Sequence, residues 1–379
     1  MNSLHTLTKA GSGAWLILAI ALWPSTASAN AGTPLIWATV FHLAVGNAFI
    51  GLLEGLLVSW IFRAPARRAI WTLIAANYLS ACAGTYLLGT LRGSVTDLTI
   101  ENIRSWIGVY AAMAFLGTLL IEFVFFWFAM RPQRSGLMRA SRAAFVVNAM
   151  SYLLLVGWYW MFSNTSMISQ LQVVSPGSLG QTGNYALYYI STDGRQVIQS
   201  DLHGDNEKVL STVTSTHRND RLFARPNESN GYDLFIHLES ESGQQVSKEL
   251  IAADFSFHAP VENANSSSNT VMHGGTHFNF GEVPSLAANS SCEFRTGFWA
   301  AEGIKGKNKY RKDSVQYALD TPFVSWGVRN ATQLDGDIIV FQLGKDQICM
   351  MHPETGRIAL IARGKGPIVA LPKPRATSK

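Results

Sequence analysis

Cysteine is scarce in this sequence, with 3 residues among 379. Three cysteines are too few for a disulfide framework, so packing rather than cross-linking must hold the fold. Cys82 lies in an apolar run, where a free thiol behaves as a small hydrophobic residue. Cys292 and Cys349 lie in the polar second half of the chain, where an oxidising compartment would permit one bridge between them; two free thiols are the alternative.

Acidic residues are nearly missing from the first 162 residues, which hold 4 Asp and Glu against 10 Lys and Arg, whereas the rest holds 21 and 20. The basic residues of the first part stand between long apolar runs, where positive charge indicates orientation in a membrane. The basic balance therefore gives no argument for nucleic-acid binding. From Ser163 onward the chain is polar and rich in Ser, Asn and Gly, which marks a domain boundary.

Residues 1–29 have the pattern of a secretory signal peptide. Lys9 precedes an apolar run at 14–23, and a small-residue site ends at Ala29. An uncleaved first helix is the alternative, but the apolar run is too short to span a bilayer. We expect cleavage after Ala29.

Four later runs have the length of about 20 residues that a membrane-spanning helix needs. They are Pro34–Phe62, Ala69–Leu91, Ser105–Met130 and Ala143–Phe162. Two of the connections are rich in arginine and are expected to be cytoplasmic; they carry Arg63, Arg67 and Arg68, and Arg131, Arg134, Arg139 and Arg142. The sequence thus predicts a four-helix transmembrane domain at 30–162 and an extracytoplasmic domain at 163–379, in a multi-pass protein of the cell membrane, with a bacterial inner membrane and a periplasmic domain as the expected setting.

Two carboxylates, Glu54 and Glu122, lie inside the apolar runs, where an ionisable group is costly and suggests function. Asn47, Gly51 and Glu54 are spaced to share one helical face, and the glycine would let a neighbouring helix approach closely. Ser80 and other polar residues could hydrogen-bond across such a seam. The candidate intramembrane residues are His42, Asn47, Glu54, Asn77, Glu122 and Asn148.

This polar set has three interpretations. It can be a packing seam satisfied by hydrogen bonds, or a proton or ion pathway. A metal or haem site is the third, but His42 precedes Glu54 by 12 residues, about 18 Å along a helix, and is the only histidine in the predicted spans. A metal would need ligands from other helices.

The second half has the short apolar segments and turn residues that are typical of antiparallel β structure. Residues 185–210 alternate short apolar strands with Asp193-Gly194 and a Gly204-Asp205-Asn206 turn, and residues 336–361 repeat this pattern. A more degenerate third copy covers 232–251. The pattern at 185–210 resembles a blade of TolB-like or WD-type β-propeller repeats, and the resemblance covers less than half of this domain.

That resemblance implies a binding surface on one end of an all-β domain and transfers no catalytic residues. A blade takes about 40 to 45 residues, so the domain could supply four or five, which is few for a closed propeller. A β-sandwich therefore stays open as the alternative to a propeller-like fold.

Chemical motifs are sparse in this half. His273 and His277 flank a Gly-Gly-Thr segment and could hold a metal, but no third ligand or helical context accompanies them, so an ordinary loop is favoured. The sequence has no nucleophile elbow, phosphate-binding loop or HExxH pattern, and it indicates no cofactor. An enzyme is not the favoured interpretation.

Three classes of function remain. The favoured one is a binding or scaffold protein of the cell envelope that holds a β-repeat domain outside the membrane for a protein or glycan partner. The second is a transport or ion-coupling protein that uses the intramembrane carboxylates, for which four helices would call for an oligomer. The third is a membrane enzyme acting on envelope or lipid substrates, with His42 and Glu54 as the first residues to test.

Overall fold

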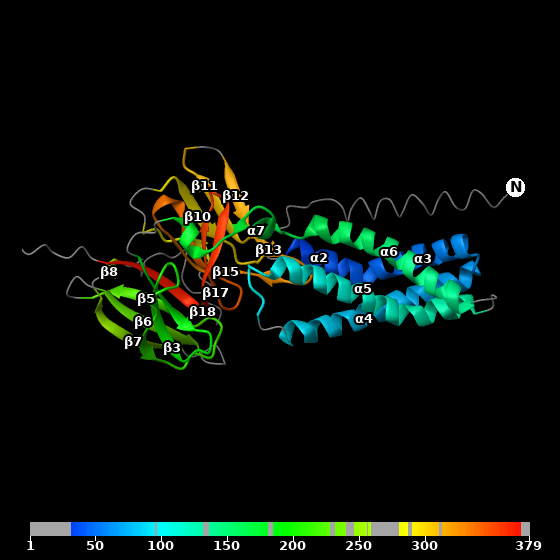
Figure 1. Ribbon diagram of the computed structural model, residues 1–379, viewed down its shortest axis with the longest axis horizontal. Coiled ribbons are helices and arrows are strands. Elements are labelled where there is room, and N and C mark those ends of the chain that lie inside the picture. The colour runs from blue at the N-terminus through cyan, green and yellow to red at the C-terminus, as the bar shows by residue number, and fades with distance from the viewer. Residues whose placement is uncertain are drawn as a thin grey trace, which may run out of the picture.

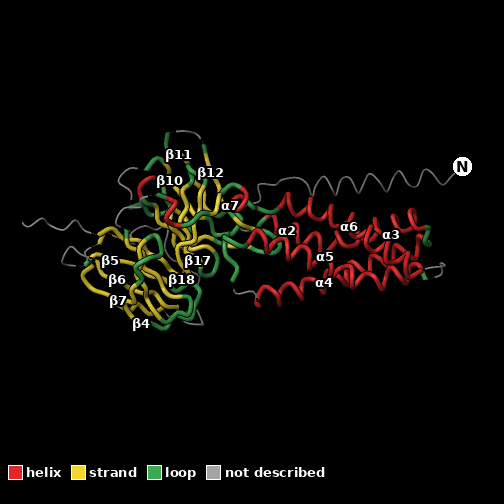
Figure 2. Tube along the Cα trace, viewed as in Figure 1, coloured by secondary structure: helices red, strands yellow, loops and turns green. Residues whose placement is uncertain are grey.

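The computed structural model describes residues 32–94, 97–131, 136–180, 185–227, 232–239, 246–255, 257–258, 280–286, 290–310 and 313–372. These residues form an elongated helical bundle joined at one end to a β-rich region (Figures 1 and 2). The expected signal peptide at 1–29 and the candidate metal ligands His273 and His277 lie outside the described residues.

The first helical stretch has three parts. It begins as α2 (Pro34–Phe41), continues through a π-helical segment η1 (His42–Gly46) and becomes α3 (Asn47–Phe62). Thr33 caps its start, because the Thr33 side chain accepts from the Ile36 N–H and proline occupies the first turn. Within η1 the Asn47 N–H donates to the His42 carbonyl, the i to i−5 bond of a π-helix, which occurs mainly as single turns inside α-helices.

Three further long helices complete the bundle: α4 (Ala66–Ser94), α5 (Ile103–Met130) and α6 (Gly136–Phe162). Helix α4 packs against both α3 and α5, and α6 packs against α5 and α3. Among the described residues, the stretches long and apolar enough to cross a membrane are Pro34–Phe62, Ile103–Met130 and Gly136–Phe162. The sequence predicts four such spans; α4 is long enough, but it carries several polar residues, including Asn77 and Ser80, and is not among the three.

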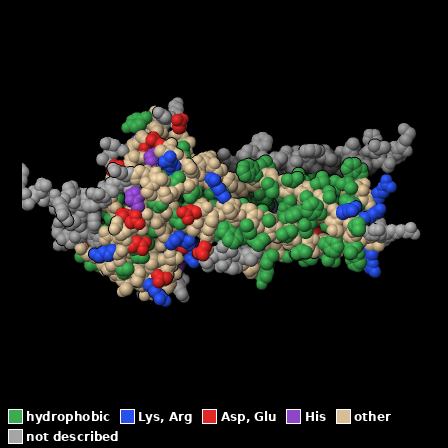
Figure 3. Space-filling view, in the orientation of Figure 1, with side chains coloured by type: hydrophobic (Ala, Val, Ile, Leu, Met, Phe, Trp, Pro, Cys, Tyr) green, Lys and Arg blue, Asp and Glu red, His purple; other side chains and the backbone are tan. Residues whose placement is uncertain are grey.

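The face of the bundle seen in Figure 3 is largely apolar. Large side chains point outward from three helices, with Trp60 80%, Leu120 77% and Leu153 74% exposed. Arginines gather at the end away from the β-rich region, where α3 and α5 end and α4 and α6 begin (Figure 3). An apolar band with positive charge at one end is typical of a membrane-embedded bundle.

Helices α3 and α4 come into backbone contact at two glycines. A Cβ atom on Gly51 would lie 2.5 Å from the Ile74 Cα atom, and one on Gly55 would lie 2.5 Å from the Ile70 Cα atom. No side chain fits at either position. The close approach expected at Gly51 is therefore present, and it places the polar face of α3 directly against α4.

The β-rich region consists of mostly antiparallel strands in four sheets. The largest has nine strands, with the order β15-β16-β17-β18-β2-β3-β4 and with β1 and β8 also paired to β18. Its strands are β1 (Gln172–Val173), β2 (Ala186–Ser191), β3 (Gln196–Asp201), β4 (Lys208–Thr212), β8 (Phe257–His258), β15 (Val328–Gln333), β16 (Ile339–Leu343), β17 (Gln347–His352) and β18 (Arg357–Pro372).

The other sheets are smaller and follow chain order or nearly so, as β12-β11-β10-β9, β5-β6-β7 and β13-β14. Their strands are β5 (Arg221–Pro226), β6 (Tyr232–Glu239), β7 (Val246–Phe255), β9 (Gly281–Glu282), β10 (Cys292–Thr296), β11 (Ile304–Asn308), β12 (Ser314–Tyr317), β13 (Leu319–Asp320) and β14 (Ser325–Trp326). Three short helical segments lie between strands or before them: α7 (Ser166–Ser169), η2 (Pro176–Leu179) and η3 (Asp335–Asp337).

The predicted hairpins are confirmed. Strands β2 and β3 pair across the turn at Gly194, whose φ of 74° suits glycine, and β3 pairs with β4 across a turn at Gly204. Strands β16, β17 and β18 form the second unit, and β6 and β7 form the third. The fold class is thus a helical membrane-type bundle plus an antiparallel all-β region; the described strands form no closed barrel or propeller.

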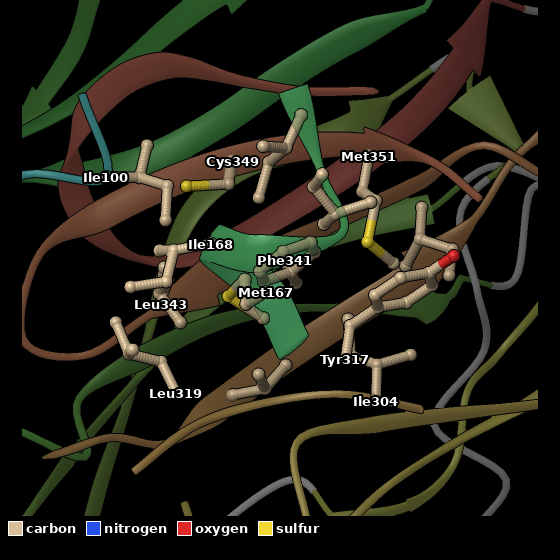
Figure 4. Packing of buried hydrophobic residues seen from close by; sticks show 14 of the residues in the cluster. Ile100, Met167, Ile168, Ile304, Tyr317, Leu319, Phe341, Leu343, Cys349 and Met351 are labelled. Atoms are coloured by element: carbon tan, nitrogen blue, oxygen red, sulfur yellow. The ribbon is translucent and has the colours of Figure 1, made fainter. Parts of the chain in front are cut away.

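The bundle and the β-rich region share one hydrophobic core. Ile100 precedes α5, and Ile103 and Tyr110 lie in its first turns, yet all three are buried among β-strand residues such as Phe341 and Cys349. Figure 4 shows Ile100 beside Cys349 in this cluster. The Tyr110 ring also stacks on Phe323, with centroids 6.0 Å apart. The chain therefore divides at Phe162 in sequence but not in its packing.

Cys292 and Cys349, the candidate disulfide pair, are both free thiols in the structure. Cys292 begins β10 and pairs with Asn308 in the four-stranded sheet, whereas Cys349 pairs with Phe341 in the nine-stranded sheet. Each cysteine is fixed by the strand register of a different sheet. Burial raises the pKa of the Cys349 thiol, which suits a hydrophobic rather than a reactive role.

Candidate functional site

All four long helices contribute polar side chains to one buried cluster in the bundle. Glu54 and Glu122 are 1% and 0% exposed, and the residues around them are also buried. We call this the carboxyl cluster; it consists of Glu54 from α3, Asn77 and Ser80 from α4, Glu122 from α5, and Asn148 and Ser151 from α6.

Glu54 is held from two sides. Asn77 Nδ2 donates to Glu54 Oε2 at 2.6 Å, and Ser151 Oγ lies 2.5 Å from Glu54 Oε1. The second amide hydrogen of Asn77 goes to the Leu73 carbonyl at 3.0 Å, so its orientation is fixed. Both oxygens of the Glu54 carboxyl group therefore face a neutral hydrogen-bonding side chain.

Glu122 lies close enough to Glu54 for the two carboxyl groups to interact electrostatically. Ser80 Oγ lies 2.6 Å from Glu122 Oε1. Asn148 also lies beside Glu122. Just outside the carboxyl cluster, the hydroxyl groups of Thr118 and Tyr152 are 2.8 Å apart.

The carboxyl cluster contains no cationic side chain among the described residues. Arg63 follows α3, Arg67 and Arg68 lie in the first turn of α4, and Arg104 at the start of α5 donates to the carbonyls of Ile168 and Leu171 at the β-rich end. Two carboxyl groups in an apolar interior without a positive partner are expensive if they are both charged. A functional demand is the usual reason for keeping such groups in a membrane.

His42 and Asn47 lie apart from the carboxyl cluster, toward the β-rich end of the first helical stretch. His42 Nδ1 lies 2.7 Å from the Tyr159 hydroxyl oxygen, and Asn47 is buried at the end of η1. Tyr78 from α4 donates to the Ala44 carbonyl within η1 at 2.6 Å. The structure thus brings together four of the six predicted polar residues and separates the other two from them.

No group of three or more His, Cys, Asp or Glu side chains within the described ranges could hold a metal. His42 and Glu54 contribute to different polar groups. The geometry of the described residues therefore gives no support to the membrane metal or haem site that the sequence left open.

A second set of buried acids, not identified from the sequence, lies in the β-rich region. Asp220 accepts from Ser215 Oγ at 2.7 Å and from the N–H groups of His217 and Glu239 at 2.9 and 2.8 Å. Lys365 Nζ lies 4.0 Å from Asp220 Oδ2. Burial lowers the pKa of Lys365, while the Asp220 carboxylate partly restores it. Asp220 thus has a cationic partner and backbone partners and is built into the fold.

Glu239 is the second buried acid of this set, and side chains contact its carboxyl group. His217 Nδ1 lies 2.9 Å from Glu239 Oε2, and Asn219 Nδ2 donates to the same oxygen at 3.0 Å. The sequence does not predict this group, because its members come from segments far apart in the chain and have no distinctive spacing.

Comparisons with known proteins do not assign the chain: no protein-family model matches it, and no curated protein matches its sequence.

Proposed function

We propose that this protein is a multi-pass membrane protein that couples an ion-binding carboxyl cluster in its helical bundle to a β-rich domain outside the cytoplasm. The observation that carries the proposal is the enclosure of Glu54 and Glu122 among neutral hydrogen-bonding side chains. A buried acid without a cationic partner gains little for folding, so its usual value is functional.

Helix α5 supplies a physical connection between the two regions. It carries Glu122 in the carboxyl cluster and Tyr110 in the core shared with the β-rich region. The two residues are 12 positions apart, about 18 Å along one continuous helix. A displacement of α5 at Glu122 would therefore reach the β-rich core without crossing a flexible linker.

The proposal places four helices across the membrane, including α4, after a signal peptide cleaved at Ala29. The arginine-rich end of the bundle would face the cytoplasm, since positive residues are retained on that side. The β-rich region would then lie in the periplasm of a bacterial cell.

Cysteine labelling tests this orientation. In a cysteine-free background, Glu293→Cys at an exposed position of β10 should react with an impermeant maleimide added to spheroplasts. Arg67→Cys should react only after permeabilisation. The opposite pattern would overturn the orientation.

Ion flux in proteoliposomes tests the coupling function. Ion gradients of protons, sodium or potassium are applied in turn, with fluorescent reporters inside the vesicles. Glu54→Gln and Glu122→Gln should abolish the flux seen with the unmodified protein, while exposed Glu293→Gln should leave it intact. Flux that persists in both bundle variants would remove the carboxyl cluster from the function.

A second function, binding or scaffolding in the cell envelope, is favoured by the shared core. Ile100 N–H donates to Gln347 Oε1 at 2.7 Å, and α5 inserts Ile103 and Tyr110 among the strands, so the β-rich domain is held firmly on its anchor. In this case its strand groups would act as propeller-like blades that present a surface to a protein or glycan. Substitutions on that surface would reproduce the phenotype of a gene deletion, whereas both Glu→Gln variants would behave like the unmodified protein.

A further inference from the structure

The two serines of the carboxyl cluster occupy equivalent positions. Ser151 Oγ lies 2.5 Å from Glu54 Oε1 and 3.1 Å from the Val147 carbonyl oxygen. Ser80 Oγ lies 2.6 Å from Glu122 Oε1 and 3.1 Å from the Asn77 carbonyl oxygen. Each hydroxyl group thus stands between a backbone carbonyl and a carboxyl oxygen.

A count of hydrogens decides what this geometry requires. A serine hydroxyl has one hydrogen to donate, and a carbonyl oxygen has none. If Ser151 donates to the Val147 carbonyl, its contact with Glu54 is a hydrogen bond only when Glu54 supplies the hydrogen. The same holds for Ser80 and Glu122. With both carboxyl groups protonated, each serine makes two full hydrogen bonds, one donated and one accepted; with a carboxylate, its single hydrogen is shared between the two oxygens or goes to the carboxylate alone.

Two polar atoms beside Glu122 argue against a bound metal ion. The side chain of Asn148, 1% exposed, interacts with the Glu122 carboxyl group, although neither Asn148 Nδ2 nor Glu122 Oε2 has a close hydrogen-bond partner among the described residues. An occupant of this place must accept from an amide and donate to a carboxyl oxygen. Water does both, whereas a metal ion cannot accept from Asn148.

Metal ions are disfavoured by the rest of the carboxyl cluster as well. A hard cation needs several oxygen lone pairs directed at it. Asn77 Nδ2 already points at Glu54 Oε2, and the two serines occupy Glu54 Oε1 and Glu122 Oε1. The donor set fits protons rather than sodium, potassium or divalent ions.

We infer that the carboxyl cluster is a proton-binding site that holds one exchangeable proton on Glu54, donated to Ser151, and one on Glu122, donated to Ser80. Release of a proton passes it to water and leaves a carboxylate; the serine then turns its hydrogen from the backbone carbonyl to that carboxylate. The inference names the ion for the proposed coupling function, but the site can exist whether or not protons cross the membrane.

Infrared spectroscopy of the full-length protein in lipid vesicles tests the site directly. At neutral pH the spectrum should contain carboxylic-acid C=O bands that shift when H₂O is replaced by D₂O. Glu54→Gln should remove one component and Glu122→Gln the other, while exposed Glu293→Gln should remove neither. Absence of these bands at neutral pH would overturn the inference.

Serine variants test the pairing of donors and acceptors. Ser151→Ala should move the Glu54 band to the higher frequency of an acid without a hydrogen-bond acceptor, with the Glu122 band unchanged, and Ser80→Ala should do the reverse. A band that does not respond to its own serine would contradict the assignment. If the bands behave as expected but no proton flux is measured, the site stands and the coupling function fails.

Discussion

Buried acids occur in both regions of this protein, but their surroundings differ. In the β-rich region Asp220 accepts two backbone hydrogen bonds and lies 4.0 Å from Lys365, so its charge has partners. In the bundle the hydrogen-bond partners of Glu54 among the described residues are the neutral side chains of Asn77 and Ser151. One acid is therefore enclosed by a cation and backbone donors that help to organise the fold, whereas the other is enclosed by neutral side chains.

Matched acid-to-amide substitutions should give the largest difference in stability between the two regions. Asp220→Asn places an amide where backbone N–H groups need an acceptor and leaves Lys365 without its anion, so we expect a loss of about 3 kcal/mol in the free energy of unfolding. Glu54→Gln keeps a neutral side chain of the same shape and should cost about 1 kcal/mol or less.

Thermal unfolding in detergent, with exposed Asp313→Asn as the neutral control, measures both changes. Equal losses for Asp220→Asn and Glu54→Gln would mean that the two acids have the same structural role.

We expect the stability of the bundle to depend more on close backbone contacts between helices than on its carboxyl groups. Gly51→Ala puts a methyl group 2.5 Å from the Ile74 Cα atom and should cost about 2 kcal/mol by forcing α3 away from α4. Gly84→Ala on α4 meets no atom within 4 Å and should change stability by less than about 0.5 kcal/mol. Proteolysis of the membrane-inserted variants would separate them; similar resistance would show that the close approach is unimportant.

Much of the carboxyl cluster could be predicted from the sequence, and the reasons are local. Helical periodicity places Asn47, Gly51 and Glu54 on one face, and an acid in an apolar run points inward because lipid cannot solvate it. Ser151 was missed, because a helical serine commonly bonds to the carbonyl four residues earlier, as Ser151 also does. Its second contact depends on where α3 lies.

The missing parts of the fold depend on long-range packing. The hairpins at Gly194 and Gly204 follow from turn chemistry, but β18 pairs with β17 through its first half and with β2 through its second. That pairing joins segments far apart in the chain and leaves no local pattern. Ile100 likewise resembles any residue of a short connection, although it is buried in the β-rich core.

Acid titration should affect the β-rich region modestly and in a known direction. Burial raises the pKa of Asp201, but the Asn206 side chain and the N–H groups of Asp205 and His203 lower it more, so the folded-state pKa lies below the usual value. Stability from Asp201 is then present above roughly pH 4 and lost as the pH falls through the folded-state pKa. Unfolding curves of Asp201→Asn should lack this component; an unchanged pH dependence would contradict it.

The smallest effect is expected from oxidation. Cys292 and Cys349 belong to different sheets, so mild oxidant should form no bridge, and migration on a non-reducing gel should match that of Cys349→Ala. A faster band that reductant abolishes would show that the two strands can separate.

The insertion of Ile100 and Tyr110 into the β-rich core also sets an order for biosynthesis. The segments that carry them leave the ribosome long before the strands that cover them, so the helices must hold these side chains in place while the rest of the chain is synthesised. A fragment beginning at Ser163 would lack that template and expose an apolar face. The helical bundle thus supplies core residues that the β-rich region needs in order to fold.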